Sequence, residues 1–328
     1  MTGPEPARAR SSREAYRDAL VALLAADERA FCLDSDTGLF TGVSFAAAKD
    51  RYVNLGISEQ NLMGMAAGLA ASGKVPFVTT MATFAATRAL EAVKLDIAYP
   101  GLPVRIAGTH AGFAAGHLGP THHALEDLAV MCALPGVTVV VPADAGQAGQ
   151  AVGQTTGIPG PVYLRLGKEA TPALESAMPG GGLPPFTVGT GQRLRAGGDL
   201  AIVACGPYPV HAALAASDAL AASGIAAAVL NLHTLWPLDV ATLLDVAGPA
   251  AAVITVEEHW RHGGLGSLVA QELAERLPKR VARIGVPETF AATAGNQREL
   301  LDQHGITSTR IIERAQALLD VRAGPGTR

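Results

Sequence analysis

The sequence predicts an α/β protein of two domains, each organised around a parallel β-sheet. The chain has 328 residues, which corresponds to two domains at about 150 residues each. Apolar runs of strand length alternate with segments of helical period through almost the whole chain, a pattern typical of βα units. The alternation stops between residues 168 and 191, where prolines and glycines cluster and indicate a linker. We therefore expect a tail at 1–12, a first domain at 13–168, a linker at 169–191, a second domain at 192–321 and a tail at 322–328.

The first domain is expected to begin with a helix at 13–26 and a strand at 30–33. Gly73 directly follows an apolar helical stripe, as a helix-ending glycine does. Pro142 and Asp144 mark the end of a strand and the cap of the next helix. The remaining strands are expected at 52–55, 75–79, 104–107, 137–141 and 162–166, and the remaining helices at 58–72, 84–99, 124–133 and 144–155.

The second domain repeats the alternation without a fixed repeat length, so it is not a solenoid. Its strands are expected at 200–205, 226–230, 252–257 and 281–284, and its helices at 210–223, 238–247, 265–277, 297–304 and 308–319.

The composition excludes several function classes. The 25 Lys and Arg against 29 Asp and Glu give a net charge of −4, which leaves no broad basic face for nucleic acid or an anionic membrane. Hydrophobic residues make up 49% and aromatic residues 5%, so the core is expected to be large and aliphatic. No apolar run approaches the length of about 18 residues that a membrane span needs. Cys32, Cys132 and Cys205 are odd in number and lie in apolar runs, so we expect free thiols and a cytoplasmic protein.

Glu59 is the first candidate functional residue. The segment 54–61, with Gly56 permitting a turn and Ser58 a possible cap, leads from a strand into a helix whose first turn holds Glu59. An acid at the positive end of a helix dipole is common and needs no function. Here, however, the following helix at 62–71 is apolar nearly all round. A carboxylate at the mouth of a buried helix is expected to be paired with another group.

Phe84 is the second candidate, at a strand-to-helix junction among small residues. Such junctions lie at the carboxyl ends of parallel strands, where α/β proteins bind ligands. A lone Phe is most often a core residue, but its small neighbours here leave the ring face open for stacking.

A glycine-rich loop holds the densest cluster of polar groups. Four of the nine histidines, His110, His117, His122 and His123, fall within 14 residues after a strand. Zinc binding is one hypothesis, but the loop has no Cys or carboxylate and its spacing fits no short zinc pattern. Proton transfer and hydrogen bonding to a polar substrate fit these residue types better.

Two further segments carry charge in apolar surroundings. Arg165 ends the last strand of the first domain and requires an anion, either a protein carboxylate or a substrate phosphate. In the second domain the segment 257–266 follows a strand and opens a helix, with two glutamates, His259 and a glycine-rich turn. Its glycine spacing is a weak indication of anion binding at a helix N-terminus.

Together these motifs resemble, in order, the C-terminal half of the transketolases. The matching stretches are 54–68, 83–88, 110–122, 139–144, 257–266 and 283–287. Transketolases encoded as two subunits are most similar, followed by 1-deoxyxylulose-5-phosphate synthases and the β subunits of 2-oxoacid dehydrogenases. The resemblance implies a pyrimidine-binding domain with the thiamine diphosphate fold and a transketolase C-terminal domain. It implies no metal ligands in this chain, with Mg²⁺ bound mainly by a partner subunit.

The resemblance also implies roles for single residues around thiamine diphosphate. Glu59 matches the glutamate at N1′ of the aminopyrimidine, which favours the imino tautomer that generates the ylid; this effect requires a water-poor site. Phe84 matches the aromatic residue stacked on the pyrimidine. Asp36 matches an aspartate near the thiazolium, and Arg88 falls where the deoxyxylulose synthases also have an arginine.

On the substrate side, the resemblance makes His110 and Arg165 sugar-phosphate ligands and aligns Arg13 loosely with a third. His122 matches a histidine that hydrogen-bonds substrate oxygens, and His110 and His122 are expected to relay protons. His117, in the same loop, is included among the expected substrate contacts.

Two departures from the family pattern have consequences. The Gly-Asp-Gly motif that holds the diphosphate and Mg²⁺ does not occur in this sequence, so we expect a partner subunit with the N-terminal half and an α2β2 heterotetramer. Leu118 stands where transketolases have an aspartate for a sugar hydroxyl, His123 replaces a glutamine, and a polar phosphate contact is lost near residues 39–40. We therefore expect ketol transfer between a ketose, with or without phosphate, and an aldehyde, on a non-standard substrate of a biosynthetic pathway. Alternatives are a 2-oxoacid dehydrogenase β subunit and a non-catalytic assembly or regulatory subunit.

Overall fold

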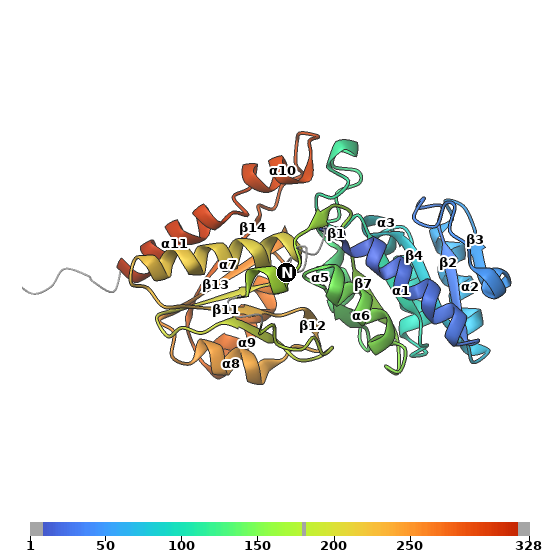
Figure 1. Cartoon of the computed structure of the whole chain (residues 1–328), viewed down its shortest axis with the longest axis horizontal. Coiled ribbons are helices and arrows are strands. Elements are labelled where there is room, and N and C mark those ends of the chain that lie inside the picture. The colour runs from blue at the N-terminus through green and yellow to red at the C-terminus, as the bar shows by residue number, and fades with distance from the viewer. Residues whose placement is uncertain (1–8, 179–181, 321–328) are drawn as a thin grey trace, which may run out of the picture.

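The computed structural model describes residues 9–178 and 182–320, and it contains two α/β units that lie side by side (Figure 1). In the first, β2, β3, β4, β5, β6 and β7 are all mutually parallel. These strands are β2 (Ala30–Asp34), β3 (Tyr52–Asn54), β4 (Val75–Met81), β5 (Arg105–Thr109), β6 (Thr138–Val140) and β7 (Val162–Arg165). The sheet has the order β12-β6-β7-β5-β4-β2-β3. The predicted α/β class with parallel sheets is confirmed.

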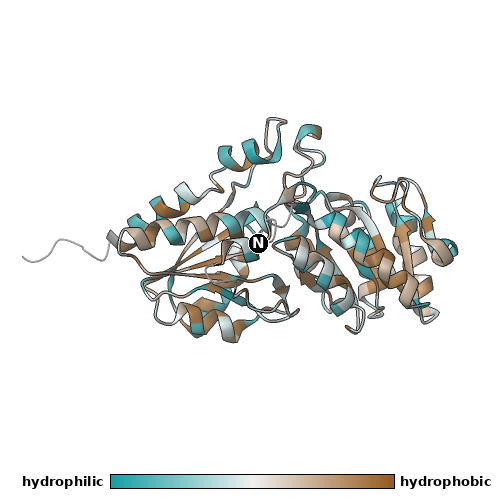
Figure 2. Ribbon diagram, viewed as in Figure 1, coloured by the Kyte–Doolittle hydropathy of each residue, from teal (hydrophilic) through white to brown (hydrophobic). Residues whose placement is uncertain are grey.

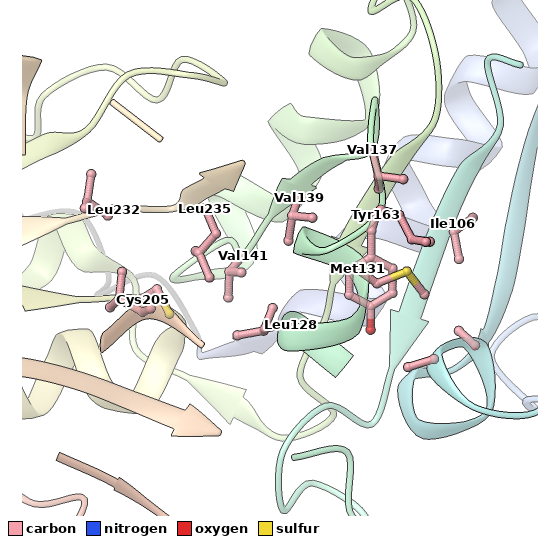
Figure 3. Packing of buried hydrophobic residues seen from close by; sticks show 14 of the residues in the cluster. Ile106, Leu128, Met131, Val137, Val139, Val141, Tyr163, Cys205, Leu232 and Leu235 are labelled. Atoms are coloured by element: carbon pink, nitrogen blue, oxygen red, sulfur yellow. The ribbon is translucent and has the colours of Figure 1, made fainter. Parts of the chain in front are cut away.

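The edge strand β12 (Thr234–Trp236) was not predicted, and it comes from the second half of the chain. It pairs antiparallel with β6, so the second half of the chain completes the first sheet. Leu232, Leu235 and Cys205 consequently share one apolar cluster with Val139 and Val141 of the first sheet (Figure 3). The two units are thus joined by a continuous core as well as by the linker.

Helices cover both faces of the first sheet. The helix α1 (Ser12–Ala26) packs with α6 (Ala145–Thr155) over one apolar cluster, and α2 (Glu59–Ala71) packs over another. Two predicted signals are confirmed: Asp144 accepts a hydrogen bond from the Gln147 amide at the start of α6, and Gly73, with φ +82°, follows the last turn of α2.

The helix predicted at 84–99 is instead three short elements, namely α3 (Ala82–Ala86), α4 (Leu90–Ala92) and the π-helical η2 (Val93–Ala98). The chain bends at Thr87, whose side chain donates back to the Thr83 carbonyl at 2.7 Å. The helix predicted at 124–133 is shortened to α5 (Asp127–Cys132). The short 3₁₀ segments of this half are η1 (Ala46–Arg51), η3 (Gly116–Leu118) and η4 (Leu174–Ala177).

The second sheet has the order β14-β13-β10-β11-β9. Its strands are β9 (Gln192–Arg195), which is antiparallel and was not predicted, β10 (Leu200–Ala204), β11 (Ala227–Asn231), β13 (Ala252–Trp260) and β14 (Arg280–Val286). Its helices are α7 (Pro207–Ala222), α8 (Val240–Ala247), α9 (Leu265–Arg276), α10 (Gln297–Gln303) and α11 (Ser308–Asp320). The helices α7 and α11 lie on one side of this sheet, and α8 and α9 on the other (Figure 1).

Apolar residues concentrate in the strands and polar residues on the outer helix faces (Figure 2). The three cysteines are free, as predicted, although Cys132 is only partly buried. Within the part of the chain that the structure describes, no helix is both long and apolar enough to cross a membrane.

The chain segments outside the expected domains are partly ordered. β1 (Arg10–Ser11) pairs with β8 (Ala170–Thr171), and Ser11 and Ser12 are buried, so the prediction of a tail is wrong for residues 10–12. The rest of the first tail through residue 8, and the tail at 322–328, lie outside the described residues, as do residues 179–181 of the expected linker. The domain boundaries themselves stay predictions.

Candidate functional site

The candidate site lies at the carboxyl ends of the parallel strands of the first sheet, where α/β proteins bind ligands. Asp36 follows β2, Glu59 follows β3, Phe84 follows β4 and His110 follows β5. Because β3, β2, β4 and β5 are consecutive neighbours in the sheet, the four residues line up along one edge. Asp36 and His110 also have φ angles of 60° and 56°. Left-handed backbone is uncommon outside glycine and often accompanies function.

One cavity of about 390 Å³ collects most of the predicted cofactor residues. It is lined by Ser35, Asp36, Thr37, Ile57, Glu59, Met81, Phe84, Arg88, Thr121 and His122. Residues from three separate strand ends and from the histidine loop thus face a single space. Asp36 is exposed and accepts a hydrogen bond from the Asn54 side-chain amide at 3.1 Å.

Glu59 is 2% exposed and is the first residue of α2. Ser58 makes no side-chain cap, so the predicted cap is wrong. The bond that Glu59 makes in the described chain comes from Arg88, whose Nη1 donates to Oε2 at 2.8 Å. The guanidinium of Arg88 also lies over the ring of Phe84, 4.5 Å from its centroid, while its side chain is 47% exposed. The carboxylate is therefore buried and paired with a cation at the edge of solvent.

His122 contacts the same aromatic ring. Its imidazole meets Phe84 edge-on, with the ring centroids 5.3 Å apart, and Nδ1 lies 2.9 Å from the Thr121 hydroxyl. The loop thus brings His122 to the cavity of Glu59.

His110 lies beside the cavity in a basic environment. Its Nε2 is 3.3 Å from Nη1 of Arg13, and its Nδ1 is 3.0 Å from the Thr109 hydroxyl. Since arginine can only donate, Nε2 accepts and the proton of the neutral ring is on Nδ1. Burial, with smaller contributions from the cations Arg13 and Lys168, lowers the pKa of His110 to about 3. His110 is therefore neutral near pH 7.

Arg165 requires a correction. Its guanidinium is 5% exposed and makes two hydrogen bonds to Asp127, at 2.8 and 3.0 Å. Asp127 also accepts from the Tyr163 hydroxyl at 2.7 Å. Of the two anions that the sequence left open, the protein carboxylate is the one present. The guanidinium is thus already neutralised inside the fold, so the expected substrate contact of Arg165 is not supported.

His117 and His123 do not join the cavity of Glu59. His117 is exposed and lines a separate cavity of about 530 Å³ between the histidine loop and the second domain. His123 is 4% exposed and meets the Phe113 ring edge-on. Leu118 is half exposed, whereas Leu39 and Phe40 belong to the core. Within residues 9–178 and 182–320 no group of three or more His, Cys, Asp or Glu side chains is arranged to hold a metal ion.

Several residues near the site were missed by sequence reasoning. The positive charge of Lys168 helps to lower the pKa of His110. Glu126 accepts a hydrogen bond from the Thr83 hydroxyl at 3.0 Å, beside Phe84. Burial raises the pKa of Glu126. Both residues directly follow predicted site motifs, so proximity along the chain was the signal that could have identified them.

Comparison with known proteins identifies the family. Residues 8–173 match the family described as transketolase, pyrimidine binding domain, and residues 189–311 match the transketolase C-terminal domain. A 6-deoxy-6-sulfo-D-fructose transketolase subunit from Clostridium sp. (strain MSTE9) is 36% identical over 94% of both chains. A subunit of an apulose-4-phosphate transketolase from Phocaeicola vulgatus is 37% identical over 92% of this chain and 96% of that protein.

A solved structure described as a split gene transketolase, inactive beta4 tetramer, is also similar. It is 42% identical, has a TM-score of 0.84, and the match covers 95% of this chain and 99% of that one. Transketolase structures from Campylobacter jejuni and Leishmania mexicana share the fold at TM-scores of 0.79. The fold, the cavity at the strand ends and these matches agree, and the chain belongs to the transketolase family, of which it comprises the pyrimidine-binding and C-terminal domains.

Proposed function

We propose that this chain is the C-terminal subunit of a two-chain transketolase that moves a two-carbon ketol unit from a ketose to an aldehyde. The observation that carries the proposal is the buried Glu59 carboxylate, which shares one cavity with Phe84, Asp36 and His122. When bound, thiamine diphosphate supplies the nucleophilic carbon that attacks the ketose carbonyl. The residues of this chain have to hold the cofactor's pyrimidine, exclude water and position the sugar.

The geometry around Glu59 fits an aminopyrimidine. Arg88 already places a planar group with N–H donors against the Phe84 ring and the Glu59 carboxylate. An aminopyrimidine makes the same two kinds of contact, a stacked face and a hydrogen bond to a buried acceptor. In the proposed complex Glu59 holds a proton at N1′ of that ring, where low solvent access strengthens the interaction. Arg88 then turns outward and remains a neighbour of the ring.

The substrate is proposed to be a ketose with an anionic end. Arg13 and Lys168 bring positive charge to His110 at the rim of the site, and a phosphate or sulfonate would pair with them. The names of two relatives describe sugars of this type, 6-deoxy-6-sulfo-D-fructose and apulose 4-phosphate. His110 is neutral, so its Nε2, which now accepts from Arg13, is proposed to accept a hydrogen bond from a sugar hydroxyl. His122 is proposed to hydrogen-bond the sugar oxygens at the reacting end, beside Phe84.

The partner is proposed to be an N-terminal subunit that holds the diphosphate and Mg²⁺. Two relatives that match almost end to end are named as transketolase subunits, and the solved beta4 tetramer is described as inactive. This chain lacks the Gly-Asp-Gly motif of the other half. An α2β2 assembly follows from the two-fold packing that such enzymes use.

The test is reconstitution with the partner subunit, thiamine diphosphate and Mg²⁺. Ketol transfer is expected from anionic ketoses, with no turnover by this chain alone. With xylulose 5-phosphate as the donor and ribose 5-phosphate as the acceptor, kcat/KM is expected to fall below the usual enzyme range of about 10⁴–10⁸ M⁻¹s⁻¹. Turnover of a 2-oxoacid with lipoamide would instead identify a dehydrogenase subunit. Cofactor binding without chemistry on any donor would indicate an assembly or regulatory subunit.

A further inference from the structure

The histidine loop forms a closed loop with a narrow neck. The backbones of Gly112 and Ala124 exchange two hydrogen bonds, at 3.0 and 2.9 Å, so residues 113–123 project as one unit. His110 and His122 lie at the two sides of this neck. Whatever holds the neck therefore holds the backbone two residues from each histidine.

The second domain holds this neck through Glu258, from the glutamate pair that the proposed function does not use. Glu258 lies in β13 and is 5% exposed. Its Oε1 accepts a hydrogen bond from the Phe113 backbone amide at 2.7 Å, across the boundary between the units. The side-chain amide of Gln297 donates to both carboxylate oxygens, at 2.8 and 3.1 Å. The carboxylate is thus aimed by one residue of its own unit at one amide of the loop.

The other side of the neck is held by the backbone of the same residue. The Glu258 carbonyl accepts from Nη2 of Arg165 at 3.0 Å, and that nitrogen also donates to the Ala124 carbonyl at 2.8 Å. Trp260, two residues later, donates its backbone amide to the Leu125 carbonyl at 3.0 Å. Alternate positions of β13, Glu258 and Trp260, therefore hold both strands of the neck.

Gly112 shows how close this contact is. Its φ is +60°, and a Cβ at this position would lie 2.4 Å from the Glu258 carboxyl carbon. A side chain here would be strained by the left-handed backbone and would have to displace the carboxylate. Further out, the Phe113 ring stacks on His304 with the planes 10° apart, and the Gly295 amide donates to the Gly116 carbonyl at 3.2 Å. These contacts hold the outer part of the loop against the same domain.

We propose that Glu258 is a positioning residue for the ketol transfer: its buried carboxylate, supplied by the C-terminal domain, clamps the neck of the histidine loop and thereby aims His110 and His122. This inference rests on the proposed function for its catalytic part. None of the described residues of the C-terminal domain lines the cavity of Glu59. The clamp gives this domain a defined task in the reaction.

The experiment compares E258A and E258Q with wild type, and uses E288Q as the matched control. Glu288 is an exposed glutamate of the same domain whose partner is Arg261. Hydrogen exchange of the full chain, read by mass spectrometry, is expected to be at least about 10-fold faster in residues 111–124 for E258A and unchanged in β4 and α2. E258Q keeps an acceptor for the Phe113 amide, so it is expected to restore most of the protection.

In the reconstituted enzyme, E258A is expected to lower kcat about 10- to 100-fold, since misplaced acid–base groups lose factors of this size. The KM for thiamine diphosphate is expected to stay within about 2-fold, because Glu59 and Phe84 are outside the loop. E258Q is expected to recover kcat to within about 5-fold of wild type, and E288Q to match wild type.

Unchanged exchange in 111–124 would overturn the clamp, and a wild-type kcat in E258A with faster exchange would overturn its role in catalysis. If E258A does not fold, Q297A removes the amide that aims Glu258 and is expected to give the same changes at smaller size. If the wild-type complex transfers no ketol group, the proposed function fails, while hydrogen exchange still decides the clamp.

Discussion

Glu59 and Glu258 are both buried glutamates of the same chain, yet their surroundings differ in kind. Glu258 is 5% exposed and receives hydrogen bonds from the Phe113 amide and the Gln297 side chain. Glu59 is 2% exposed, and its bonding partner is the half-exposed Arg88. The carboxylate of Glu258 is satisfied by groups as buried as itself. That of Glu59 depends on a side chain that can leave.

The difference indicates what each carboxylate is for. Buried charge is costly unless it is paired and hydrogen-bonded, so a carboxylate held by fixed groups belongs to the architecture. A buried carboxylate held by a half-exposed cation, beside an aromatic ring that lines a cavity, is available to a ligand. Four predictions test whether this division between an architectural and a reactive glutamate is correct.

The largest effect is expected from E59Q in the reconstituted enzyme. Without a carboxylate at N1′, exchange of the thiazolium C2 proton and ketol transfer are expected to fall by at least about 10²-fold, the lower bound for lost acid–base assistance. Exchange is followed by proton NMR with deuterated solvent. Gln is nearly the same size, so folding is expected to be unaffected.

The matched control is D96N, which alters an exposed carboxylate near the end of η2. D96N is expected to exchange the C2 proton at the wild-type rate. Retained exchange in E59Q would show that the carboxylate acts elsewhere and would remove the basis of the proposed function.

The second prediction concerns stability, for which replacing Glu258 is expected to have a larger effect than replacing Glu59. E258A leaves the Phe113 amide and the Gln297 amide without an acceptor, and each buried unpaired group costs about 1–3 kcal/mol. We expect E258A to lower the free energy of unfolding by about 3 kcal/mol and E59A by less than about 1 kcal/mol. Urea denaturation followed by circular dichroism measures both. Equal losses would mean that the two glutamates are not different in kind.

The sequence predicted the elements that local pattern determines. Strand-length apolar runs and helical stripes gave the strands β2 to β7 close to their observed positions. His122 was found from the cluster of histidines in its loop. Glu59 and Phe84 were found because each follows a strand, and parallel strands end at one edge. Sheet order then brings them together without further information.

What the sequence missed depends on contacts between distant segments. Arg165 finds Asp127, which is 38 positions away, and a charge in an apolar run does not say which anion it meets. The strand β12 joins a sheet built by the other half of the chain, which no local pattern reveals. The bond from Phe113 to Glu258 spans 145 positions, so the clamp was visible only as an unexplained pair of glutamates.

A third prediction concerns Glu257, which precedes Glu258 and is fully buried. Burial raises the pKa of Glu257 to about 7, although the Gly266 amide donates to Oε1. A carboxyl group whose pKa is higher in the folded state stabilises the fold at low pH and loses this contribution as pH rises toward 7. We expect the free energy of unfolding of wild type, relative to that of E257Q, to fall by about 2 kcal/mol from pH 5 to pH 7.

Urea titrations at intervals across this range measure the difference, in which groups common to both proteins cancel. A flat difference would mean that Glu257 is ionised throughout. It would then be a charged member of the buried network rather than a neutral one.

The smallest effect is expected from R88A. This variant tests whether Arg88 pairs with Glu59 only until the cofactor binds. Arg88 occupies the Phe84 face and the Glu59 oxygen that a pyrimidine would use. If Arg88 holds that place until the cofactor arrives, R88A removes a competitor, and thiamine diphosphate is expected to bind the complex about 2- to 5-fold more tightly. This range corresponds to about 0.4–1 kcal/mol, which lies within the range of a solvent-accessible ion pair.

Isothermal titration calorimetry on the reconstituted complex measures this affinity, with R276A as the control, since Arg276 is an exposed arginine paired with Glu272 in the other domain. Weaker binding in R88A would mean that Arg88 contacts the bound cofactor, as the resemblance to the deoxyxylulose synthases suggests. In that case the Glu59–Arg88 pair would stay intact during catalysis. Glu59 and Glu258 would then differ only in how exposed their hydrogen-bonding partners are. Tighter binding would mean instead that Arg88 only takes the place of the pyrimidine when no cofactor is bound. The fold would then keep the Glu59 carboxylate paired and still let the cofactor displace Arg88.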